Sequence, residues 1–241
     1  MTDKLGEGHI LSRYDKEIMQ LRGLMLEMGA AVLEQLKEAV AAMEARDVEM
    51  ARKVIYRERH IHDLDMTANE ECIKHLAMRS PVASDLRLVI SLSKCISDLE
   101  RIGDEARKIA HTTLRLFDQG PGAARPALLY DVSVLAEKAI RMLVNAVHVI
   151  EREDLELAIH VIQSDAELDR LFKDSLRRLS TFLLEDPRHI GAAIDIIFVL
   201  KALERIGDHA ENVCAHMIYA VKGKDPRFIK KDHLSVGFLE G

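Results

Sequence analysis

Two pairs of acidic residues, each spaced four apart, recur in this 241-residue chain. Glu100 and Asp104 belong to the segment LERIGD, and Glu204 and Asp208 belong to an identical second copy. Residues four apart share one face of a helix, where like charges cost about 0.2–0.5 kcal/mol unless a counter-charge offsets them. Carboxylate oxygens are ligands for hard and borderline cations. The paired acids therefore indicate metal binding.

A glycine, Gly103 or Gly207, lies between the two acids of each pair. A glycine inside a helix costs about 1 kcal/mol relative to alanine. Because this unfavourable glycine occurs at the same position in both copies, it indicates a local structural or binding role. We expect each glycine to let another backbone or a bound ion approach closely.

A further pair in each half supplies two more candidate ligands. Asp165 and Asp169 are again four apart, and when the two halves are aligned Glu58 and His62 stand opposite them. His62 adds a nitrogen ligand, which iron, zinc or manganese accepts. The predicted metal ligands are Glu58, His62, Glu100 and Asp104 in the first half, and Asp165, Asp169, Glu204 and Asp208 in the second.

Ordinary surface charge is the alternative explanation for these acids. The chain contains 40 Asp and Glu residues, so pairs at this spacing also arise by chance on solvated helix faces. Arg101 and Arg205, inside the repeated segment, are candidate ion-pair partners. Most of the eleven histidines do not cluster, and we expect them to lie at the surface.

The distribution of glycine and proline predicts long helices. Between Gly29 and Gly103 Pro81 is the single breaker, and between Pro126 and Pro187 there is none. Breaker-free stretches rich in Ala, Leu, Glu, Lys and Arg favour helix. Trp is absent and aromatic residues make up 4%, which disfavours a β-sandwich or barrel. Six helices are predicted to end near Met43, Met78, Phe117, Glu151, Asp186 and Val221, with Asp47 and Asp154 as N-caps.

An internal repeat organises these helices into two units. The two LERIGD segments are offset by 104 residues, and Pro81 and Pro187 fall at corresponding breaks. The predicted fold is all-α, with two tandem three-helix bundles of residues 10–119 and 124–223. The linker is predicted around Gly120, and residues 224–241 are predicted to form a loosely held tail.

Composition excludes several classes of function. The net charge of -6 disfavours a dedicated nucleic-acid binder. Three widely spaced cysteines without a CxxC pair argue against a disulfide framework and fit a reducing cytoplasm. No signal peptide is recognisable, and no apolar run approaches the roughly 20 residues of a membrane span. The GxxxxGK[ST], HExxH and GxSxG motifs are absent, so no enzyme is predicted.

The segments LERIGDEARKIA and LERIGDHAENVC resemble those of the PhoU family, which are accessory and regulatory proteins of phosphate-specific transport. The resemblance covers roughly residues 14–223. It implies a cytoplasmic, often dimeric protein that negatively regulates phosphate uptake and the phosphate-starvation response. The implied partners are the ATP-binding subunit of the phosphate transporter and a membrane sensor histidine kinase.

The resemblance also implies metal binding through E/D-x-x-x-D motifs, which coincide with the eight ligands named above. His62 departs from the acid expected there, and Lys108 departs from the usual Asn, which the second copy keeps as Asn212. The N-terminal site is therefore expected to bind metal more weakly than the C-terminal site or to prefer a different metal.

Two other functions fit a helical, carboxylate-rich chain. A ferritin-like di-iron oxidase needs Glu-x-x-His on one helix face, and no Glu in this sequence has His three residues later. A metal-free helical adaptor or scaffold has no such requirement and stays open. Measuring the metal content of the protein separates it from a metal-binding regulator.

Overall fold

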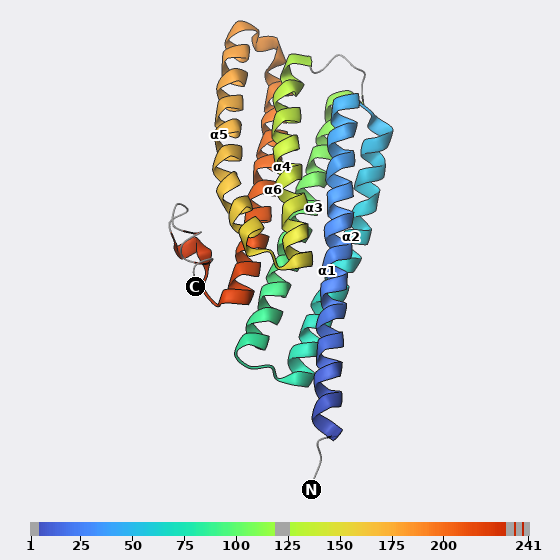
Figure 1. The fold of residues 1–241 in the computed structure, drawn as a ribbon. Helices are drawn as coiled ribbons and strands as arrows, with labels where there is room; N and C mark the ends of the chain where they lie inside the picture. Colours follow the sequence, from blue (N-terminus) through green and yellow to red (C-terminus); the bar gives the residue numbers. More distant parts are fainter. Residues whose placement is uncertain (1–4, 119–125, 230–233, 235–237, 239–241) are drawn as a thin grey trace.

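The computed structural model describes residues 5–118, 126–229, 234 and 238, and all regular structure in this part of the chain is helical. The long helices, shown in Figure 1, are α1 (Leu5–Ala45), α2 (Val48–Arg79), α3 (Ser84–Phe117), α4 (Pro126–Arg152), α5 (Leu155–Glu185) and α6 (Ile190–Lys222). Two short 3₁₀ helices, η1 (Pro187–His189) and η2 (Pro226–Phe228), flank α6. The prediction of an all-α fold with six long helices is confirmed.

Local sequence signals fix several helix ends. The Asp47 carboxylate accepts a hydrogen bond from the Met50 amide at 2.9 Å, and Asp154 accepts one from Leu157 at the same distance. Both predicted N-caps are thus confirmed, each satisfying an amide that the helix leaves unpaired. At the other end of the chain, α6 stops at Gly223, whose φ of 69° is a left-handed conformation that glycine adopts without strain.

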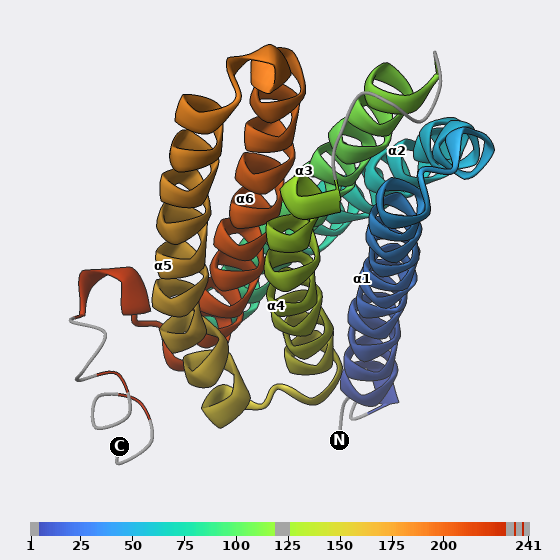
Figure 2. The ribbon, with the colours of Figure 1, turned by 90° about the horizontal axis from the view of Figure 1, so that it is seen from above.

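The six helices form two bundles, α1–α3 and α4–α6, which lie side by side (Figures 1 and 2). Helices α3 and α6 make the most extensive packing in the molecule and run antiparallel, since Arg87 near the start of α3 contacts Ala220 near the end of α6. We call this contact the α3–α6 seam. Helices α1 and α4 add a second contact between the bundles.

Apolar stripes on α3 and α6 form the centre of the core. Leu99 and Ile102 on α3 and Leu203 and Ile206 on α6 are fully buried, as the helical spacing of the apolar residues predicts. Each such side chain contributes about 1.5–3 kcal/mol relative to exposure to water. The stripes hold each LERIGD segment rigidly, which fixes where its acids project.

The two motif glycines allow side chains of the neighbouring helix to approach closely. A Cβ at Gly103 would lie 3.3 Å from Ile61 of α2, and a Cβ at Gly207 would overlap Leu168 of α5. The protein atoms that approach are side chains, so the expectation of an approaching backbone is wrong, while the approach of an ion stays a prediction. The glycines set the spacing between the second and third helices of each bundle, which carry the candidate ligands.

The C-terminal tail is held more firmly than its composition suggests. Pro226, Leu234 and Phe238 are buried, so the expectation of a loosely held tail is wrong at these residues. The predicted linker around Gly120, where the predicted bundle boundaries meet, lies outside the described residues. Among the described helices, none combines the length and apolar character that crossing a bilayer requires.

Candidate metal centres

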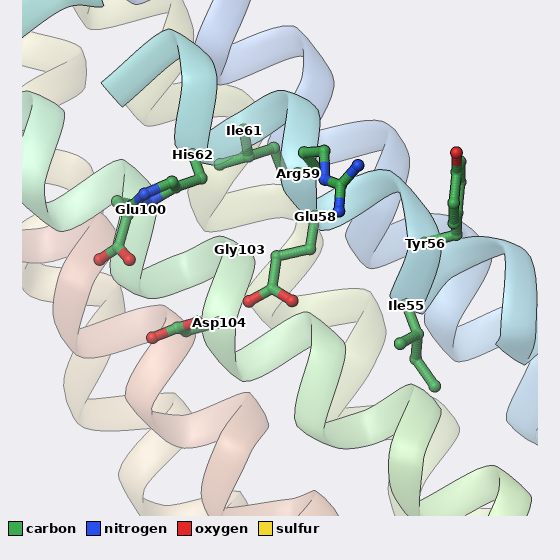
Figure 3. Close-up of a pocket in the computed structure, with 9 residues that line it drawn as sticks. All are labelled: Ile55, Tyr56, Glu58, Arg59, Ile61, His62, Glu100, Gly103 and Asp104. Atoms are coloured by element: carbon green, nitrogen blue, oxygen red, sulfur yellow. The ribbon is translucent and has the colours of Figure 1, made fainter. Parts of the chain in front are cut away.

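The four ligands predicted in the N-terminal bundle line one pocket of about 470 Å³ between α2 and α3. Glu58 and His62 come from α2, and Glu100 and Asp104 come from α3 (Figure 3). The carboxylates of Glu58 and Asp104 point into the same space, and the imidazole of His62 lies towards Glu100 (Figure 3). The helix spacing set at Gly103 thus brings the predicted residues together.

A resident cation neutralises part of this N-terminal cluster. Arg107, one turn after Asp104, pairs with Asp104 at 3.0 Å and also with Glu58. Burial raises the pKa of Glu58, and the charge of Arg107 opposes this while Asp104 adds to it. Burial and then Asp104 raise the pKa of Glu100. The N-terminal acids therefore repel one another but already have an internal counter-charge.

The C-terminal cluster is assembled from α5 and α6. Asp165 and Glu204 are buried, and Asp165, Asp169 and Glu204 all act on Asp208. Burial first, and then the negative charges of Glu204 and Asp165, raise the pKa of Asp208 to about 6. This shift indicates that the four predicted carboxylates lie close enough to disfavour ionisation of one of them.

Lysines, rather than the predicted arginine, neutralise part of the C-terminal cluster. Lys201 pairs with Glu204, and Lys173 lies 3.6 Å from Asp169. Arg205 instead crosses the seam to Glu105 at 2.8 Å, so it is not the ion-pair partner of the motif acids in its own bundle. In the first bundle, burial and Asp104 raise the pKa of Glu100. The charge of Arg101 lowers it, but by less, so the pKa stays raised.

The donor set of each cluster fits a metal ion by its chemistry. Carboxylates with raised pKa values gain from a bound cation, and oxygen donors suit a hard or borderline one. Within the described part of the chain, no three His, Cys, Asp or Glu side chains converge closely enough to hold an ion in their present rotamers. Metal binding at the eight predicted residues thus stays a prediction.

Sequence reasoning missed a buried polar network across the α3–α6 seam. The Asp98 carboxylate lies 2.8 Å from His209 Nδ1 and 3.2 Å from His216 Nε2, and all three residues are buried. Burial alone would raise the pKa of Asp98, but its hydrogen bonds to the two histidines outweigh this and lower it. The expectation of surface histidines is wrong here. One sequence signal could have predicted a buried carboxylate here: Asp98 directly precedes Leu99, which belongs to the buried apolar stripe.

These features define a class of protein: an all-helical protein of two repeated three-helix bundles, with carboxylates facing one another across the second and third helices of each. The family model described as the PhoU domain matches residues 25–113 and again residues 132–217. The chain belongs to the PhoU family. The two matches fall in the two bundles that the repeat predicts.

Related proteins match almost the whole chain. It is 40% identical over 219 residues to the phosphate-specific transport system accessory protein PhoU homolog of Pseudomonas putida, covering 91% of this chain and 84% of the relative. It is 34% identical over 226 residues to the phosphate-specific transport system accessory protein PhoU of Escherichia coli K12, covering 94% and 92%.

Two crystal structures share the fold. PhoU from Pseudomonas aeruginosa is 39% identical with a TM-score of 0.83, covering 88% of this chain and 100% of that one. The phosphate transport system regulatory protein PhoU from Streptococcus pneumoniae is 27% identical with a TM-score of 0.79, covering 88% and 98%. Both similarities extend over both bundles, so the tandem arrangement is the fold of the family.

Proposed function

We propose that this protein is a negative regulator of phosphate uptake and of the phosphate-starvation response. The observation that carries the proposal is the similarity to phosphate-specific transport system accessory proteins, which covers more than nine-tenths of the chain. Nothing in the composition points to phosphate by itself. The regulator is expected to act by binding proteins and to have no catalytic activity.

The proposed partners are the ATP-binding subunit of the phosphate transporter and the phosphate sensor histidine kinase. The proposed location is the cytoplasm, where both partners would be reached, and the proposed assembly is a homodimer. The net charge of -6 supports protein partners over nucleic acid. Long helices with half-exposed faces supply surface for such contacts.

A bound cation is proposed as part of the same regulator. In the C-terminal bundle Asp165, Asp169, Glu204 and Asp208 would hold iron, zinc or manganese, which would neutralise their mutual repulsion. The raised pKa of Asp208 supports this placement. In the N-terminal bundle Glu58, His62, Glu100 and Asp104 would bind more weakly, because Arg107 already occupies the position of a counter-charge.

A metal-free helical adaptor remains the alternative to the metal-binding regulator. The two alternatives differ in one measurable property, the metal content of protein purified without chelators or a metal-affinity tag. We expect iron, zinc or manganese to co-purify. Metal-free protein that also fails to bind any of the three would favour the adaptor.

The regulatory proposal is tested by deleting the coding sequence and measuring phosphate-starvation gene expression in phosphate-rich medium. We expect derepression, restored by a plasmid copy of the wild-type chain. Continued repression in a strain with no second copy would contradict the proposal.

A further inference from the structure

One half of the α3–α6 seam is open. A groove of about 640 Å³ runs between the second half of α3 and the first half of α6. Thr112 and Arg115 line it from α3, and Phe198 and Lys201 line it from α6. We call this the seam groove.

The repeat relates this groove to the other half of the seam, which is closed. At the offset of 104 residues, Thr112 corresponds to His216 and Ala202 corresponds to Asp98, two members of the buried network. The closed half is filled by this network, because Asp98, His209 and His216 are all buried. The short helix η2 lies beside α5 and the end of α6 in Figures 1 and 2. One fold therefore presents one sealed and one open version of the same surface.

An exposed apolar stripe leads into the open half. Ile190, Ile194 and Phe198 follow one another at a spacing of four on α6, with 57%, 46% and 60% of their surfaces exposed. The corresponding residues of α3 are Leu86, at 41%, Ile90, at 38%, and the charged Lys94. The open half thus carries an aromatic side chain where the closed half carries a cation.

The rim of the seam groove is positively charged, although the chain as a whole carries -6. Four Lys and Arg side chains line it against Glu105 and Asp195, but Arg115 pairs with Asp195 at 2.7 Å and Lys201 pairs with Glu204 beside the groove. Glu105 is buried and is shared between Lys108 at 2.9 Å and Arg205 at 2.8 Å. Both of these cations are about half exposed, so one of them is available to a carboxylate that approaches from solvent.

We propose that the seam groove docks an acidic amphipathic helix of a protein partner. Apolar residues at a helical spacing would cover Phe198 and Ile194, and Glu or Asp residues beside them would meet Lys108 and Arg205, which share the single acid Glu105. This inference rests on the proposed regulation by protein contacts and names the surface and the chemistry of the contact. It requires no bound metal.

The test uses two synthetic helical peptides with the same apolar stripe, one carrying Glu and the other Lys at the flanking positions. Binding of each fluorescently labelled peptide to the full chain is followed by anisotropy. We expect the Glu peptide to bind, its affinity to fall with added salt, and the Lys peptide to bind at least tenfold more weakly.

Variants place the binding in the groove. Phe198→Ala and Lys108→Gln are each expected to weaken Glu-peptide binding at least fivefold, while Ile90→Ala, an exposed apolar residue of the closed half, leaves it unchanged. All three positions are at least a third exposed, Arg205 still holds Glu105 in Lys108→Gln, and unchanged thermal melts show that the variants are folded. Equal binding of the two peptides, no binding, or equal loss in Ile90→Ala would overturn the proposal.

Other occupants and the proposed function are tested separately. Binding to phosphatidylglycerol vesicles that Phe198→Ala abolishes, or a shift from dimer to monomer on the same substitution, would overturn the partner-helix proposal in favour of a membrane or a second copy. If the deletion strain stays repressed, the proposed function fails whatever the peptides do. If the strain is derepressed and the peptides do not bind, the docking proposal alone fails.

Discussion

The two acid clusters have the same helical scaffold but a different balance of charge. In the N-terminal bundle Arg107 pairs with Glu58 and Asp104, whereas the C-terminal copy has Glu211 at the corresponding position. Burial, and then Glu204 and Asp165, raise the pKa of Asp208 to about 6. Both copies are thus partly neutralised, but Arg107 bridges acids of two helices, whereas Lys201 and Lys173 each pair with an acid of their own helix. The copy without the arginine has the greater need of an external cation.

The largest expected effect concerns the seam that joins the copies. Asp98→Ala makes the first copy like the second, which has Ala202 there, and removes the acceptor shared by His209 and His216. Leaving two buried polar groups unsatisfied should lower the free energy of unfolding by about 3 kcal/mol, measured by urea denaturation. Ser97→Ala, on the exposed side of α3, is the control and should change it by less than about 0.5 kcal/mol. Equal values for both variants would show that the network does not stabilise the seam.

Removing the internal cation should make the N-terminal cluster more like the C-terminal one. Arg107→Gln releases Glu58 and Asp104. Manganese or zinc affinity at this cluster, measured by calorimetry, should rise about tenfold, which corresponds to about 1.4 kcal/mol. Lys94→Gln, at an exposed position of the same helix, should leave it unchanged. An unchanged affinity in Arg107→Gln would mean that Arg107 does not compete with a metal.

The motif glycines should differ in their tolerance of a methyl group. Gly207→Ala places Cβ into buried Leu168, so it should destabilise the protein by about 1 kcal/mol despite the higher helix propensity of alanine. Gly103→Ala meets Ile61 at 3.3 Å, and strain and propensity should nearly cancel. Thermal melts of the two variants measure the difference. A larger loss in Gly103→Ala would contradict the packing described for the two bundles.

The smallest effect is the pH dependence of the C-terminal cluster without metal. The ordinary pKa of an Asp is 3.8, and that of Asp208 in the folded chain is about 6. The protonated form therefore stabilises the fold below pH 4, and this stabilisation is lost as the pH rises through 6. Since Asp208 is only partly buried, solvent screening limits the loss to about 1 kcal/mol. In chelator, Asp208→Asn should flatten this part of the stability curve, and an unchanged curve would rule out Asp208 as its source.

Sequence reasoning could predict the fold because the signals were local. Breakers, apolar periodicity and the caps at Asp47 and Asp154 act within a few residues, and the repeat supplied the long-range organisation. The gathering of Glu58, His62, Glu100 and Asp104 at one pocket also followed from helical spacing plus the repeat.

Contacts between the two bundles could not be predicted in the same way. The partners of Asp98 lie more than a hundred residues away, and the repeat does not predict them because Asp98 corresponds to Ala202. Arg205 looked like a neighbour of its own motif acids, yet it crosses the seam to Glu105. Such pairings depend on how two helix faces meet, which no local pattern encodes.

The central claim is that the C-terminal carboxylates bind a cation. The most direct test compares thermal melts of wild type and Asp208→Ala, first with chelator and then with added iron, zinc or manganese. With chelator, Asp208→Ala should be neutral or stabilising, since it relieves repulsion from Glu204 and Asp165. With metal at about 100 times its dissociation constant, wild type should gain about 2.7 kcal/mol, and Asp208→Ala should lose most of that gain. A destabilisation of Asp208→Ala that is the same with and without metal would contradict the claim and make these acids ordinary ion pairs.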